Sequence, residues 1–221
     1  MPNNDKISDR ELALRKELAK RTVDMHSSNR VERVSAERSP EIIEIGREIS
    51  RLINEEMLEQ ARERLQSELR KHPDELMFLN FQMILDGLDK PYGNYNHAKI
   101  AGAKLIEKAL EQDNAYYAMA AINNLGLIAH NEGHDEFSLA MYLMAHFIDR
   151  KAFSVLCNLT GWYSRRGKYE QAMQWVNKII ENNPDWQSDE EITAFFTSNE
   201  SLHNLRQYGF FKQNVLSKIG K

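Results

Sequence analysis

Two segments of the chain repeat each other at a fixed spacing. The dipeptide Asn-Leu at 124–125 returns at 158–159, and Gly133 returns as Gly167, each pair 34 residues apart. A period of this size indicates an array in which each copy is one supersecondary unit that buries its apolar face against its neighbours. The stretch 121–186 therefore predicts two consecutive helical hairpins, and it constrains the fold more than any other feature.

Composition excludes several other classes of protein. The chain has 221 residues, 42% of them hydrophobic, and a net charge of −4, which argues against a general nucleic-acid binder because such proteins carry a basic excess. Cys157 is the only cysteine, so no intramolecular disulfide forms. The N-terminus lacks a secretory signal and no apolar run is long enough to span a bilayer, so we expect a cytoplasmic protein without membrane insertion.

Helical patterns extend upstream of the repeated stretch. Ser39 and Pro40 form a helix start, because serine caps the first turn and proline is tolerated at the first helical position. The helix 76–88 is apolar almost all round, which predicts burial on most sides or a face toward another copy. The predicted hairpins are 40–72, 76–112 (with the turn 89–96 and a returning helix from 98), 116–149 and 152–182.

The two ends of the chain differ from the array. Residues 1–38 predict a charged helical extension and linker, which either packs weakly on the array or binds a partner or another copy. Residues 188–221 predict a helical cap, with one helix at 190–196 and another ending near Tyr208. We expect Gly209 to stop that helix in a left-handed conformation, and Phe210 and Phe211 to be buried. The predicted domains are thus 1–38, 39–187 and 188–221.

The fourth hairpin resembles a tetratricopeptide repeat, and the third resembles the same unit less closely. The residues that carry the resemblance in the fourth copy are Asn158, Leu159, Tyr163, Gly167, Lys168, Tyr169, Ala172 and Pro184; in the third they are Asn124, Leu125, Gly126, Gly133, Tyr142 and Ala145. The third copy departs from the pattern at Arg150, where a proline is expected, and extra residues in the turn 131–136 would shift its second helix. The first two hairpins match by pattern alone, through Ala61, Pro73, Leu79, Gly87 and Ala109.

The resemblance implies an all-α fold, a right-handed α-solenoid of about four hairpins whose concave surface holds a peptide or a partner helix. It implies that Asn124 and Asn158 face this surface and hold a peptide backbone; the alternative is that they bond to neighbouring helices. Asn123, Leu127, His130 and Arg165 complete the set of predicted partner-binding residues. The paired Lys/Arg positions of the carboxylate-gripping subclass are absent, and Cys157 lies on that face instead.

The sequence contains no pattern that indicates an enzyme. His130 and His134 have the spacing of two metal ligands on a helix, but Gly133 lies between them in a predicted turn, so we expect no metal site and no cofactor. Cys157 has no base near it in the sequence and is expected to be a small buried side chain. A metal-dependent enzyme or regulator built on these three residues is the least favoured hypothesis.

We therefore expect a non-enzymatic adaptor or scaffold that binds a peptide or helix of a partner protein in the concave groove. The alternative is a cytoplasmic secretion-type chaperone that holds a segment of an exported protein. A chaperone would bind an unfolded segment, whereas a scaffold would bind a folded assembly. Homo-oligomerisation is compatible with either function.

Overall fold

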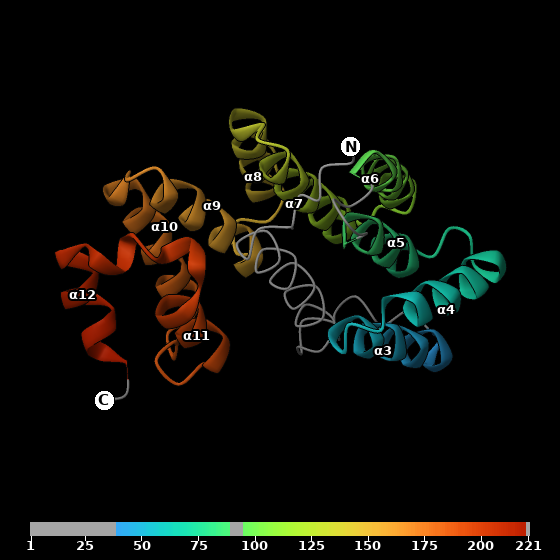
Figure 1. The fold of residues 1–221 in the computed structure, drawn as a ribbon, viewed down its shortest axis with the longest axis horizontal. Helices are drawn as coiled ribbons and strands as arrows, with labels where there is room; N and C mark the ends of the chain where they lie inside the picture. The colour runs from blue at the N-terminus through green and yellow to red at the C-terminus, as the bar shows by residue number, and fades with distance from the viewer. Residues whose placement is uncertain (1–38, 89–94, 220–221) are drawn as a thin grey trace, which may run out of the picture. The chain divides into compact units, whose positions relative to one another are not determined.

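The described residues are entirely helical in their regular structure. The computed structural model describes residues 39–88 and 95–219, which form ten α-helices and three short 3-10 helices, with no strand among them (Figure 1). The predicted helix within 1–38 and most of the turn 89–96 lie outside these residues. The chain divides into two compact units, Met1–His134 and Asp135–Lys221, called unit 1 and unit 2 below.

Unit 1 contains five long helices in its described part. They are α3 (Pro40–Asn54), α4 (Leu58–Lys71), α5 (Leu76–Leu88), α6 (Tyr95–Glu111) and α7 (Ala115–Asn131). Each packs against the next along the chain, and α5 also packs against α7. The side chain of Ser39 accepts a hydrogen bond from the backbone of Ile42, so the predicted start of α3 is confirmed. The prediction that the helix 76–88 is buried on most sides is confirmed as well.

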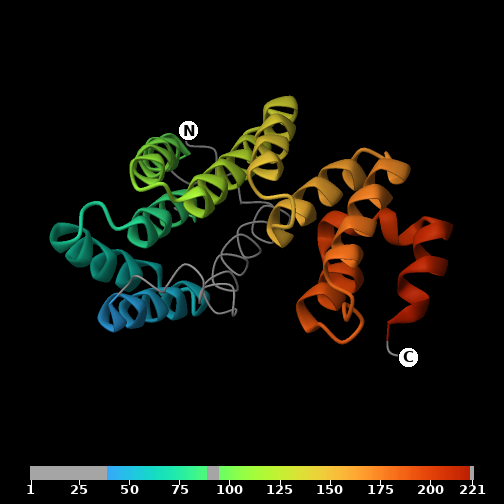
Figure 2. The same cartoon turned by 180° about the vertical axis from the view of Figure 1, so that it is seen from behind.

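Unit 2 contains the last hairpin and the C-terminal helices. Its elements are α8 (Asp135–Ile148), α9 (Phe153–Arg165), α10 (Tyr169–Asn182), α11 (Glu190–Ser198), η1 (Glu200–Leu202), η2 (Leu205–Gln207), α12 (Gly209–Asn214) and η3 (Leu216–Lys218). Helices α9 and α10 lie side by side in both views (Figures 1 and 2). The rings of Trp186 and Phe196 are 5.6 Å apart, so the end of the fourth hairpin contacts the cap.

Three expectations about the C-terminal segment were wrong. The helix predicted to end near Tyr208 is replaced by η1 and η2, because Asn199 caps a single short turn through its side chain instead of starting a longer helix. Gly209 begins α12 and is not in a left-handed conformation. Phe211 is fully buried as expected, but half of Phe210 is exposed.

One type of turn ends four of the described helices. In each of these turns, a carbonyl in the last turn of the helix accepts a hydrogen bond from the backbone N–H five residues later in the chain. The residue just before that N–H has a positive φ, as in the Schellman motif. Two of the left-handed positions are the repeated glycines, which have no Cβ penalty there; the other two carry acidic residues. The four N–H donors are Met57, Asn114, His134 and Lys168, after Glu56, Asp113, Gly133 and Gly167 respectively.

Most helix bounds of the third and fourth hairpins keep the period of 34 residues; the exception is the pair of starts at Ala115 and Phe153. Helix α7 ends at Asn131 and α9 at Arg165, while α8 and α10 begin and end 34 residues apart. The turn 131–136 therefore causes no shift. The fourth residue of each returning helix is small and fully buried, which allows close approach of the neighbouring helix. These residues are Ala61, Ala98, Ser138 and Ala172, so Ser138, and not Ala145, matches Ala172 in register.

Candidate functional site

Asn124, the central residue of the predicted peptide-binding set, forms a hydrogen bond to another helix of unit 1. It lies on α7 with only 8% of its surface exposed, and its Nδ2 donates to Oδ1 of Asn80 on α5 at 3.5 Å. The neighbouring Asn123 and Leu127 are also buried. A buried amide that bonds an adjacent helix has less capacity left for a peptide. The geometry of Asn124 thus favours the alternative in which it ties two helices together.

The other predicted residues are divided between the two units. His130 is half-buried at the end of α7 in unit 1, whereas Asn158 and Arg165 lie on α9 in unit 2, Asn158 buried and Arg165 half-buried. The predicted residues of unit 1 thus lie on α7, and those of unit 2 lie on α9. Their role in partner binding stays a prediction.

The residues considered as metal ligands or as a nucleophile are His130, His134 and Cys157. Gly133 has φ +82° and His134 follows it outside α7, so His130 and His134 do not share a helical face. Within residues 39–88 and 95–219 no group of three or more His, Cys, Asp or Glu side chains is placed to hold a metal ion. Cys157 is buried in the apolar core of unit 2.

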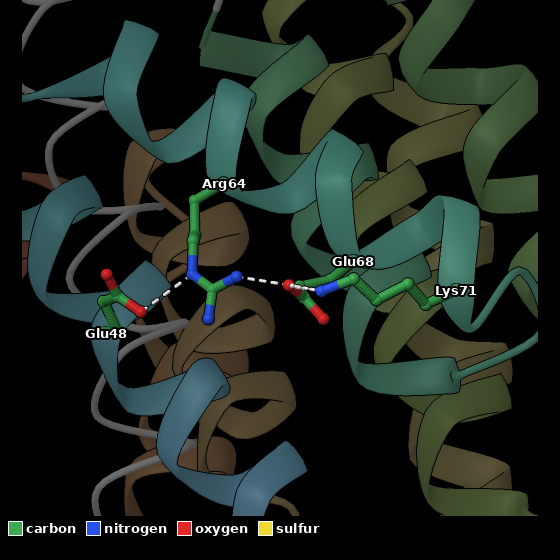
Figure 3. A network of polar contacts seen from close by, with 4 residues as sticks. All are labelled: Glu48, Arg64, Glu68 and Lys71. Carbon is green, nitrogen blue, oxygen red and sulfur yellow. Dashed lines mark hydrogen bonds and ion pairs between the residues drawn. The ribbon is translucent and has the colours of Figure 1, made fainter.

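A charged network joins α3 and α4, and the sequence alone did not indicate it. The guanidinium of Arg64 lies between two carboxylates (Figure 3): its Nε donates to Glu48 at 2.8 Å, and its Nη1 pairs with Glu68. Lys71 also donates to Glu68, at 2.9 Å. The hydrogen bond from Lys71, assisted by the charge of Arg64, holds the pKa of Glu68 below its ordinary value although burial opposes this. All four groups are satisfied within one hairpin, so we assign the network to stability.

The most distinctive surface of the described chain belongs to α8. One side of this helix is fixed in unit 2 at both ends. At its start, the indole Nε1 of Trp162 donates to the carbonyl of Asp135 at 3.0 Å, and Arg166 both stacks on Trp162 and pairs with the Asp135 carboxylate. At its end, the ring of His146 meets Trp175 edge to face at 4.9 Å. Helix α8 thus contacts α9 near its start and α10 near its end.

The opposite side of α8 is apolar and exposed. At 100° per residue its exposed large side chains fall on one continuous arc, away from the buried Ser138, Tyr142 and Ala145. Five large apolar side chains of a fourteen-residue helix are exposed, with Phe147 the most open at 79%. The α8 face is defined here as these five residues, Phe137, Leu143, Met144, Phe147 and Ile148, together with the exposed Ala140.

The matching helix one period later shows that this face is unusual. The positions of α10 that correspond to the α8 face are exposed too, but they are polar: Gln171, Gln174, Asn177, Lys178, Glu181 and, half-buried, Asn182. Elsewhere in the described residues, exposed large apolar side chains such as Ile100 and Leu110 on α6 occur singly or well separated. Single exposed apolar residues are ordinary, whereas a contiguous patch marks an interaction surface.

The α8 face was not predicted from the sequence, although the sequence of α8 carries a signal for it. Helix α8 has no lysine or arginine and no polar stripe, so its apolar residues surround it. The same pattern in α5 accompanies burial on nearly every side. Sequence periodicity does not distinguish the two cases, because it shows how apolar a helix is and not how many neighbours cover it.

Comparison with protein-family models, with curated proteins and with solved structures gives no match for this chain. No helix within the described ranges is long and apolar enough to cross a membrane.

Proposed function

We propose that this protein is a non-enzymatic adaptor that works by binding other protein chains, and that the α8 face is its principal contact surface. The single observation that carries this proposal is the contiguous apolar surface on a helix whose opposite side packs in unit 2. Exposing such a surface to water is costly, and covering it with another protein recovers about 25 cal/mol per Å² of apolar area before the costs of association.

The tetratricopeptide-like interpretation, with a right-handed solenoid, belongs to the same proposal. It is supported by the helix bounds that repeat at 34 residues and by the small buried residue at the fourth position of each returning helix. Arrays of this kind act mostly through surfaces and not through catalytic groups, which is an argument from fold alone. Peptide binding by Asn124 and Asn158 is kept as a separate hypothesis.

The test is capture from native lysate with the full-length protein as bait, followed by mass spectrometry. Phe147→Glu places a charge on the most exposed residue of the α8 face, and Leu110→Glu makes the same change at an isolated exposed site on α6 that is 69% open. We expect Phe147→Glu to lose a bound protein that Leu110→Glu retains. Equal capture by wild type and Phe147→Glu would overturn the assignment of the α8 face.

The same experiment separates the hypothesis of the predicted groove from that of the α8 face. Asn124→Ala and Asn158→Ala are added as single variants, with circular dichroism to check that each is folded. If only these variants lose the bound protein, the partner occupies the surface implied by the resemblance and not the α8 face. Whether the captured protein is folded or bound as an unfolded segment distinguishes an adaptor from a chaperone.

A further inference from the structure

We propose that the chain that covers the α8 face is a second copy of this protein, bound through the same face in an antiparallel, twofold-symmetric pair. This inference rests on the proposed function, because it names one partner of the surface assigned there. It is carried by three features of the face: its area, its lack of internal charge and the opposite charges at its two ends.

The exposed area matches what a small symmetric interface needs. A large apolar or aromatic side chain has a surface of about 200 Å². The five large residues of the face are between 39% and 79% exposed, so together they present about 500 Å² per copy. Two copies would bury about 1,000 Å² at the centre, and the rim adds to this, which reaches the lower range of specific protein interfaces.

The face is also complementary to itself. A twofold interface brings the same patch of two molecules together, so any uncompensated charge at its centre would meet a like charge. Along the arc between Phe137 and Ile148 every exposed side chain is apolar. A heterologous partner would need no such symmetry, whereas a second copy requires it.

The ends of the face determine the orientation of the pair. Glu136 is exposed at the start of α8, and Arg150 and Lys151 are exposed just beyond its end. Asp149 lies there too, and its carboxylate accepts the backbone N–H of Lys151 at 2.8 Å, so the three residues together leave one net positive charge at this end. A parallel pair would place Glu136 next to Glu136 and the cations next to the cations. An antiparallel pair places each acidic end beside a basic end and also opposes the two helix dipoles favourably.

One antiparallel register fits both the shape and the charges. If Phe147 lies opposite Ala140 of the second copy, Leu143 lies opposite its Met144, and Glu136 faces the end of the second α8, beyond which Arg150 and Lys151 lie. Ala140 is the one small residue of the face, so the most exposed ring meets the position with most room for it. Alternation of large and small side chains across facing positions is the pattern by which helices interdigitate.

The experiment is sedimentation equilibrium and light scattering on the purified full-length protein over a range of concentrations. We expect the wild-type chain to be a dimer, Phe147→Glu to weaken dimerisation at least tenfold, and Leu110→Glu to leave it unchanged. Phe147 is 79% exposed, so we expect its substitution to leave the fold intact, and circular dichroism and thermal unfolding check this. A monomeric wild type, or equal loss in Leu110→Glu, overturns the proposal.

A charge exchange tests the orientation. Glu136→Lys and Lys151→Glu should each weaken the dimer several-fold at low salt, and the double variant should restore it, because only an antiparallel pair brings these positions together. Failure of restoration overturns the antiparallel arrangement. A monomer that still captures another protein through Phe147 would refute the second copy and leave the adaptor function in place. A dimer that captures no other protein would refute the adaptor function and leave the pairing of two copies in place.

Discussion

Removing the cation Arg64 should destabilise the protein more than neutralising the anion Glu68, although the two form one ion pair. The Glu68 side chain is 2% exposed, whereas Arg64 is 31% and Lys71 60% exposed. Breaking a buried pair is costly when the residue left behind is a buried charge, about 3–5 kcal/mol for a fully buried pair. When Glu68 is neutralised instead, Arg64 and Lys71 remain partly exposed to water, so neither becomes a buried unpaired charge.

The expected loss of unfolding free energy for each variant depends on the charged partners that remain around the unchanged side chains. Arg64→Met keeps the apolar stem but leaves Glu68 with Lys71 alone, so we expect a loss of about 2–3 kcal/mol, below the range for a fully buried pair because Arg64 is partly solvated. Glu68→Gln keeps the shape and loses only the charge, which should cost about 1 kcal/mol. Glu48 is 43% exposed, so Glu48→Gln, the control for the outer contact, should cost at most about 1 kcal/mol.

The assay is urea unfolding followed by far-UV circular dichroism, with variants compared at a common m-value. Tryptophan fluorescence is unsuitable here because Trp162, Trp175 and Trp186 all lie in unit 2, whereas the network lies in unit 1. A loss for Glu68→Gln that equals or exceeds the loss for Arg64→Met would refute the reasoning. The pKa of Glu68 is lowered in the folded protein, so its contribution is present above the ordinary carboxyl pKa and is lost as the pH falls through the folded value.

Other measurements test the turns, the packing and the titration of unit 2. Gly167→Ala should cost about 1 kcal/mol because φ is +68° there, and Asp113→Gly should stabilise by up to about 1 kcal/mol because its φ is +51°, both by thermal unfolding. The Ser138 hydroxyl is buried without a hydrogen-bond partner in the described structure, so Ser138→Ala should stabilise by about 1 kcal/mol; any destabilisation would contradict this. Burial lowers the pKa of His146, and Lys178 and Arg150 act in the same direction, so the folded state binds fewer protons than the unfolded state and stability should fall as the pH drops below about 6.5. Fluorescence of the neighbouring Trp175 reports that loss, which His146→Gln should reduce; an equal pH dependence in that variant would exclude His146 as the cause.

The sequence by itself determined the helices and most of their ends. Ser39 and Pro40 start α3, and Gly167 ends the turn after α9, because capping, ring constraint and positive φ are local properties of a few adjacent residues. Where local signals were ambiguous, as at Gly209, the prediction was wrong: a glycine permits a left-handed conformation but does not require it.

Only the tertiary structure decided which side chains are covered. Asn124 bonds Asn80, 44 residues earlier in the chain, and Glu68 loses its contact with water through packing that no local pattern specifies. Helices α5 and α8 have similar apolar patterns, yet α5 is buried on nearly every side, whereas α8 has an exposed apolar face. The physical reason is that burial depends on the number and position of neighbouring elements, and these are set by contacts between residues distant in sequence.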